Sequence, residues 1–366
     1  MSAFATSQCN ATSGRMSRPQ RGRSQGRTGT SRVRGGRLGV KWRVFVLAAV
    51  LSLVGGCGLS SSRVPAAEAI GPLETNRMTV AMLKAVESVP LMLAVEEGWF
   101  AELGLDVDIK VVGSDRDVVN GLVAGEHDIA QGSYVLLVGA QATQAVDLRI
   151  VTDNSYATLD TAVLVTMPDS STSSIQELEG ARIAVPERDN SAELMVKSAM
   201  EANSLNFTTV VWRPMQLHQM TAALQRGEVD AAMLVEPYIT TTKMAIGATQ
   251  LLDLSIGPTR ELPLTAYSAT AEFVRTHPET IKVFQLVMRR ATEVAGNRAR
   301  AEAVLPKVVD IDQRYTPLLN LPGFRSSLDY GRIQRVAVLM KNFGMLKSPF
   351  DVSHMLAPDP TDLTSG

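Results

Sequence analysis

The chain has 366 residues, of which 45% are hydrophobic and 20% charged, which is ordinary for a folded protein with room for more than one lobe. Its net charge of −1 hides an asymmetry, because residues 1–56 hold ten of the 36 Lys and Arg residues and no Asp or Glu. The rest of the chain therefore carries a net charge of −11, which argues against nucleic-acid binding because a phosphate backbone needs a basic face.

Residues 1–57 have the order of an export signal. A basic region ends at Arg43, and the apolar run 44–54 that follows is too short to span a bilayer. The tetrapeptide V-G-G-C that ends at Cys57 resembles the bacterial lipobox, which implies cleavage before Cys57 and a diacylglycerol on its sulfur. An incidental cysteine after an apolar run is the alternative. Cys9 would be lost with the signal, so we expect no disulfide, and residues 58–75 are predicted to be a flexible tether.

Residues 76–165 are predicted to form the first part of lobe 1. Strands are predicted at 78–83, 105–112, 128–132, 147–155 and 161–166, and helices at 88–100 and 114–125. Ser114 is placed to cap the second helix and Gly125 to end it. This alternation predicts an α/β fold with a mostly parallel sheet and helices on both faces.

The alternation then repeats, so residues 166–258 are predicted to form lobe 2. Strands are expected at 181–186, 207–212 and 229–235, and helices at 190–203 and 220–227. Residues 259–366 are predicted to return to lobe 1 through a strand at 263–270 and to continue as helices at 277–296 and 328–346.

One motif occurs at matching places in both lobes. The stretches LVAGEHDIA (122–130) and LQRGEVDAA (224–232) both read L-x-x-G-E-x-D-x-A. The glycines are typical of helix ends, and the acids mark the turn into the next strand. We therefore interpret the motif as the mark of two similar lobes, joined by a hinge around a ligand cleft, and not as an acidic site used twice.

Several further blocks resemble one known family. In order along the chain they are VPLMLAVEEGWFAELGLDVDI, GLVAGEHDIAQGS, VPERDNSAELMV, LQRGEVDAAMLVEPY and HPETIKVFQLVMRRA. Together they are similar to the substrate-binding proteins of ABC importers for sulfonates, nitrate, taurine and thiamine-precursor pyrimidines. The resemblance covers most of residues 78–351 and implies a two-lobed type II periplasmic-binding-protein fold.

This resemblance also implies partners and a role. The protein would be a lipid-anchored, extracytoplasmic monomer that closes on a small ligand and delivers it to a membrane permease and its ATPase. The chain departs from the family at PERDNS, where many relatives have a Gly/Ser/Thr-rich loop. It departs again at Val235, where relatives often have an aromatic residue. Both departures fall at the expected pocket, so the ligand is left open.

Candidate ligand-binding residues lie where strands lead into helices, because helix N-termini there offer free N–H groups. The candidates are Ser88, Ser114, Gly132, Ser133, Asn154, Asn190, Ser191, Trp212, Glu236 and Tyr267. Helix capping is the alternative for the Ser and Asn residues, and core or hinge packing is the alternative for the rest. Arg116, Arg188 and Arg213 are further candidates for pairing an anion, with a solvated loop arginine as the alternative.

Catalytic and metal chemistry have little support in the sequence. The four His residues are scattered, no G-x-S-x-G or P-loop occurs, and no cofactor is expected. Two other functions stay open. One is an enzyme on the same fold, of the thiamine-pyrimidine or menaquinone-pathway type, although the export signal and the missing Cys-rich motif count against it. The other is a lipoprotein that senses a ligand for a different partner.

Overall fold

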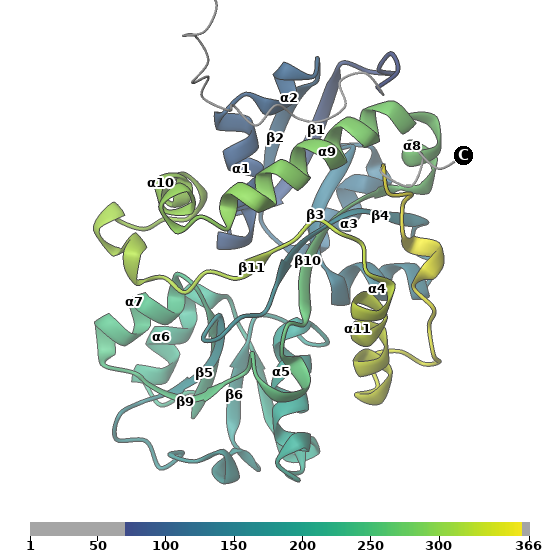
Figure 1. The fold of residues 1–366 in the computed structure, drawn as a ribbon. Coiled ribbons are helices and arrows are strands. Elements are labelled where there is room, and N and C mark those ends of the chain that lie inside the picture. The colour runs from purple at the N-terminus through teal and green to yellow at the C-terminus, as the bar shows by residue number, and fades with distance from the viewer. Residues whose placement is uncertain (1–69, 361–366) are drawn as a thin grey trace, which may run out of the picture. The chain divides into compact units, whose positions relative to one another are not determined.

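The structure is a computed structural model that describes residues 70–360, all of which belong to the compact unit 62–366. The predicted signal sequence, Cys57 and residues 58–69 of the predicted tether lie outside the described residues. Within this unit the chain forms two β-sheets, each flanked by helices, which confirms the predicted two-lobed α/β fold (Figure 1).

The sheet of lobe 1 has six strands in the order β11-β4-β10-β3-β1-β2. Their bounds are Arg77–Leu83 (β1), Asp106–Val112 (β2), Ile129–Ser133 (β3), Leu148–Tyr156 (β4), Pro263–Thr270 (β10) and Gly323–Phe324 (β11). The sheet of lobe 2 has five strands in the order β7-β6-β8-β5-β9. Their bounds are Ala162–Thr166 (β5), Arg182–Val185 (β6), Val211–Pro214 (β7), Ala231–Val235 (β8) and Thr249–Asp253 (β9).

Both sheets are mixed, which corrects the prediction of mostly parallel sheets. Among the named strands, parallel pairing joins β1 to β2 and β3, and β6 to β7 and β8. The strands next to the crossings between lobes pair antiparallel, because the chain leaves lobe 1 through β4 and re-enters it through β10. The strand β5 also pairs within the second sheet, so its residues do not join the sheet of the first lobe, where the sequence boundary at 165 put them.

Helices cover both faces of each sheet. Their bounds are Val89–Glu96 (α1), Trp99–Glu102 (α2), Asp115–Ala124 (α3), Tyr134–Ala142 (α4), Ser191–Ala202 (α5), Leu217–Gln225 (α6), Tyr238–Ile246 (α7), Ala271–Thr276 (α8), Pro278–Ala295 (α9), Arg298–Val308 (α10) and Tyr330–Asn342 (α11). In lobe 1, α1, α2 and α9 pack with one buried cluster and α3, α4 and α11 with another. In lobe 2, α6 and α7 cover one face and α5 the other (Figure 1).

The repeated L-x-x-G-E-x-D-x-A motif has the same geometry in both lobes. Gly125 and Gly227 end α3 and α6 with φ of +67° and +65°. The following aspartates each bind a strand of their own sheet: Asp128 Oδ2 accepts from Thr79 N of β1 at 2.8 Å, and Asp230 Oδ2 accepts from Arg182 N of β6 at 2.7 Å. The motif therefore joins a helix end to the sheet in each lobe, as the sequence predicts.

Among residues 70–360, three connecting segments link the lobes, in addition to the packing of α11 on α5 and of Phe343 on Phe207. Two are the crossings between β4 and β5 and between β9 and β10. The third is the stretch 318–321, in which Asn320 N donates to Glu236 Oε1 at 3.1 Å and Leu321 O accepts from Thr158 Oγ1 at 3.0 Å. Over residues 70–360, no helix has both the length and the apolar character needed to cross a bilayer.

Candidate functional site

One cavity of ≈ 180 Å³ has walls from both lobes, and we call it the interlobe cavity. Lobe 1 contributes Leu83, Ala85, Glu87, Asp115, Gln131, Ser133, Leu264 and Thr265. Lobe 2 contributes Ala162, Pro186, Asn190, Ser191, Ala192, Met195, Leu217, Met233 and Val235. The cavity is below the roughly 300 Å³ at which sites for drug-sized ligands begin, so it suits a small ligand.

Two carboxylates form the polar part of the lobe 1 wall. Glu87 lies in the 3-10 turn Val86–Ser88 after β1, and Asp115 is the first residue of α3. Burial raises the pKa of Glu87, and the nearby Asp115 raises it further. Burial also raises the pKa of Asp115, against the hydrogen bond from Ser133, and Glu187 adds to the increase. These two side chains are thus close enough to affect each other's charge.

Ser133, at the end of β3, has two roles at this wall. Its hydroxyl donates to Asp115 Oδ2 at 2.9 Å and also caps α4 by accepting from Leu136 N. Capping and a place at the cavity therefore coexist in one residue. The hydroxyl proton is already engaged by a carboxylate of the protein.

Gln131 and Ser88 form the base of the same wall. Gln131 is only 1% exposed, and its Oε1 accepts from Leu83 N at 3.4 Å and lies 2.6 Å from Ser88 Oγ, whose single proton is shared with Leu83 O at 2.7 Å. Because the Leu83 N–H needs an acceptor, Oε1 is held toward β1. Gln131 Nε2 then has no hydrogen-bond partner among the described residues. Ser88 is fully buried beneath the cavity and does not line it.

The wall from lobe 2 is mostly apolar. Its polar members are Asn190, which caps α5 by accepting from Glu193 N at 3.0 Å, and Ser191, the first residue of that helix. Met195 and Met233 are buried behind them and lie within the largest hydrophobic cluster. A ligand would therefore meet polar groups on lobe 1 and a largely hydrophobic surface on lobe 2.

The structure brings three of the predicted residues to the cavity, namely Ser133, Asn190 and Ser191. Asn154 lies next to it, fully buried, where its Nδ2 donates to Glu87 O and Thr265 Oγ1, both at 2.9 Å. Asn154 thus supports two residues that line the cavity.

Five other predicted residues lie away from the cavity wall. Ser114 caps α3, and Gly132 packs closely against side chains of α3 and α4. Tyr267 is fully buried, with its ring edge-to-face against Phe284 at 5.5 Å. The other two, Trp212 and Glu236, belong to lobe 2. Trp212 has the guanidinium of Arg188 5.8 Å from its ring, and Glu236 binds the connecting stretch 318–321.

Sequence reasoning missed Glu87, Asp115 and Gln131. Glu87 and Asp115 are chain neighbours of the predicted residues Ser88 and Ser114, so the rule that sites follow strand ends did locate both segments. The pattern does not show which of two adjacent residues faces the cleft. Gln131 precedes the predicted Gly132 inside the same strand, and its own position carries no capping or loop signal.

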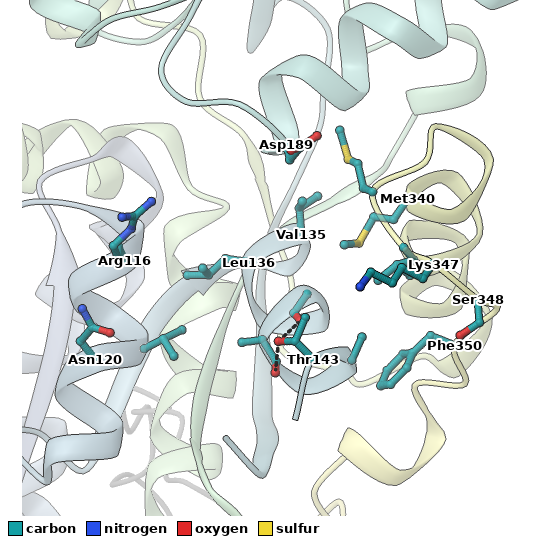
Figure 2. A pocket seen from close by; sticks show the side chains of 16 residues that line it. Arg116, Asn120, Val135, Leu136, Thr143, Asp189, Met340, Lys347, Ser348 and Phe350 are labelled. Carbon is teal, nitrogen blue, oxygen red and sulfur yellow. Dashed lines mark hydrogen bonds between the residues drawn. The ribbon is translucent and has the colours of Figure 1, made fainter. Parts of the chain in front are cut away.

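A larger pocket of ≈ 630 Å³ lies elsewhere on lobe 1. Figure 2 shows Leu136 of α4, and Thr143 at the end of that helix, between two residues of α3 and the segment with Lys347 and Phe350. Asp189 is its single contribution from lobe 2. We therefore take the smaller interlobe cavity as the candidate site, because both lobes supply extensive walls to it and not to the larger pocket. No group of three or more His, Cys, Asp or Glu residues that could hold a metal ion occurs within residues 70–360.

Comparison with known proteins gives consistent matches. The family model described as NMT1/THI5 like matches residues 85–301. A protein of Bacillus subtilis (strain 168) named for aliphatic sulfonate binding is 24% identical over 257 residues, which are 69% of this chain and 73% of that protein.

Two solved structures show the same fold at low identity. The periplasmic aliphatic sulphonate binding protein SsuA from Escherichia coli has a TM-score of 0.66 at 16% identity, with 78% of this chain and 93% of that chain covered. The ligand binding component of an ABC-type import system from Staphylococcus aureus, solved with zinc bound, has a TM-score of 0.68 at 12% identity, covering 80% and 99%.

Proposed function

The chain belongs to the NMT1/THI5-like family, as its sequence blocks predict, and from this premise we propose that it is a solute-binding protein that delivers a small organic ligand to an ABC importer. The observation that carries the proposal is the interlobe cavity, whose walls come from two lobes that three segments connect. A ligand held by both walls favours the closed arrangement of the lobes, because only that arrangement offers it both sets of contacts.

Binding without covalent chemistry is the proposed mode of action. The cavity wall offers carboxylates, an amide, hydroxyls and apolar side chains, and it includes no His, Cys, Lys or Arg within residues 70–360. The named relatives are binding proteins, and one belongs to an ABC-type import system. These observations support a receptor that presents its closed form to a permease and an ATPase.

The proposal is tested by a thermal-shift screen of small organic solutes, followed by small-angle scattering on each solute that stabilises the protein. A ligand that binds only the folded state raises the melting temperature by mass action, and lobe closure should lower the radius of gyration. Val235→Trp, which fills the cavity, should abolish both effects. Val123→Trp, on an exposed position of α3, is the matched control and should keep them. Stabilisation that persists in Val235→Trp would place binding elsewhere.

Anchoring at Cys57 is a second part of the proposal, and it depends on the lipobox-like sequence at 54–57. We propose that the mature protein is held at the extracytoplasmic face of the membrane by lipid on Cys57 and acts there as a monomer. Labelled palmitate should mark the wild type and not the Cys57→Ala variant. Label that survives this substitution would contradict the anchor without affecting the binding proposal.

A further inference from the structure

The charged residues that line the interlobe cavity are acidic. Its titratable lining residues within the described chain are Glu87 and Asp115, both acidic, and neither has a basic partner among the described ion pairs. The basic side chains nearby along the chain are engaged or face elsewhere. Lys84 pairs with Asp310, Arg188 pairs with Glu193, and Arg116 lines the larger pocket. The cavity therefore presents two carboxyl groups that have no basic partner among the described ion pairs.

The place where an anion would bind on lobe 1 is already filled. In an α/β fold an anionic ligand is expected at the N-terminus of a helix, where free N–H groups and the helix dipole favour negative charge. At α4 this position belongs to Asp115, which accepts from the hydroxyl of Ser133 at 2.9 Å. A sulfonate placed there would meet a carboxylate of the protein and lose the donors it needs.

Gln131 supplies an independent sign that a ligand binds at this wall. Its Nε2 is unpartnered and almost wholly buried, while the side chain lines the cavity. An unmet buried donor is costly, so a ligand acceptor that reaches it would be stabilised. The wall thus combines two carboxyl groups with one neutral amide donor.

From these contacts we infer that the ligand carries a cationic N–H donor group, an ammonium or amidinium, that binds Glu87 and Asp115. This inference rests on the proposed solute-binding function and specifies the ligand class at the same site. The wall from lobe 2, with Met195, Leu217, Met233 and Val235, contacts the apolar part of the ligand. A sulfonate, the ligand for which two of the named relatives are called, is an anion and would be repelled by ionised carboxylates at this wall.

The experiment uses pairs of probes with similar frames and opposite charge. Benzamidinium is compared with benzenesulfonate, and butylammonium with butanesulfonate, by thermal shift and calorimetry on the folded protein. We expect the cation of at least one pair to stabilise the wild type and its sulfonate partner to have no effect. Stabilisation by a sulfonate and not by its cation would overturn the inference, although the proposed solute-binding function would then stand.

Two variants test whether the named carboxylates are responsible. Glu87→Gln and Asp115→Asn should each weaken binding of the cation by about tenfold or more, because each removes one of the two carboxylates that pair with the bound cation. Asp117→Asn, two residues along the same helix and exposed, is the matched control and should bind as the wild type does. Unchanged cation affinity in both cavity variants would overturn the assignment to Glu87 and Asp115.

The direction of proton exchange gives a further check. Binding a cation favours the ionised carboxylates, so it should release protons, and affinity should rise with pH. The groups that face one another here are Glu87, Asp115 and Glu187, with Ser133 as hydrogen-bond donor. Calorimetry in two buffers of different ionisation enthalpy measures the exchange. Proton uptake on binding would contradict the inferred ligand charge.

Discussion

The aspartates of the repeated motif have a structural role that is larger in lobe 2. Asp128 accepts one backbone hydrogen bond, from Thr79 N, whereas Asp230 accepts from Arg182 N and also forms a two-armed pair with its guanidinium, at 3.0 and 2.7 Å. We expect Asp128→Asn to lower the free energy of unfolding by about 1 kcal/mol and Asp230→Asn by about 1–3 kcal/mol. Urea unfolding measures both.

The neighbouring glutamates of the motif are natural controls. Glu126 pairs with Lys110 and Glu228 with Arg226, and all four side chains are well exposed. Glu126→Gln and Glu228→Gln should therefore change the unfolding free energy by less than about 1 kcal/mol. Ligand affinity should be unchanged in all four variants. A loss of affinity at unchanged stability would contradict the structural role of the aspartates.

A buried carboxyl on β4 should make stability depend on pH. Asp153 accepts from Tyr134 Oη at 2.9 Å and pairs with Arg332 at 3.1 Å, yet burial raises its pKa from 3.8 to about 6. A raised pKa means that the folded state binds the proton more tightly than the unfolded state does. The resulting stability is complete below pH 3.8 and is lost as the pH rises through about 6.

The test compares the wild type with Asp153→Asn, which cannot titrate. Between pH 5 and pH 7 the wild type should lose about 1 kcal/mol of unfolding free energy relative to the variant. Chemical denaturation at each pH gives the difference. A difference that is constant, or that grows in favour of the wild type with pH, would show that the pKa of Asp153 is not raised in the folded protein.

At the residue scale the sequence predicts segments better than side chains. It predicts Ser133, Asn190 and Ser191, which line the interlobe cavity. These residues lie where a strand leads into a helix, and in both lobes that edge of the sheet faces the cleft. It does not distinguish Ser114 from Asp115, since both follow the same strand. Asp115 lines the cavity and Ser114 does not, because Asp115 is held there by a hydrogen bond from Ser133, which is 18 residues away in the chain.

At the scale of elements, Gly125 and Gly227 occupy equivalent places in the two lobes, at the ends of α3 and α6. An added Cβ at Gly125 or Gly227 would touch nothing within 4 Å, so only the positive φ opposes a side chain. Gly125→Ala and Gly227→Ala should each lower the unfolding free energy by about 1 kcal/mol. Gly139 lies inside α4, where an added Cβ would be 3.9 Å from Met340 Cε. Gly139→Ala should therefore raise the unfolding free energy by about 0.5–1 kcal/mol. Thermal unfolding of the three variants should show these opposite signs.

The elements that the sequence predicts correctly are those with local signals. The strand at 78–83 and the helix at 114–125 have clear periodicity and caps, and the structure places β1 and α3 there. The helix predicted over 88–100 is divided, because Gly98 has a φ of +71° between α1 and α2. The strand predicted at 207–212 begins only at Val211, since residues 207–209 form a 3-10 turn that Asn206 caps.

The whole molecule depends on how its lobes are connected, and local patterns do not reveal this. The order of strands and helices predicts two lobes, but it does not show that 162–166 pairs with β8 and β9. Nor does it show that the stretch 318–321 forms a third link, because that contact joins Glu236 to a residue 84 positions away. Contacts of such long range depend on the assembled fold.

Glu236 tests this third link. Its carboxylate accepts from Thr240 N at 3.1 Å, from Thr240 Oγ1 at 2.9 Å and from Asn320 N at 3.1 Å, and the side chain is 2% exposed. Glu236→Ala leaves these buried donors unmet and should lower the unfolding free energy by about 1–3 kcal/mol. It should also release one of the three connections, so the radius of gyration without ligand should increase.

The same variant separates the link from the ligand contact that the sequence predicts for Glu236. If the carboxylate acts on the hinge, affinity falls because the lobes sample open arrangements more often, and stability falls with it. If the carboxylate contacts the ligand, affinity falls while the scattering profile without ligand is unchanged. Thr241→Ala, one residue along α7 from Thr240 and without a bond to the carboxylate, is the control for local damage to the helix. Scattering and calorimetry on both variants decide between the two roles, because only loss of the link changes the ligand-free protein.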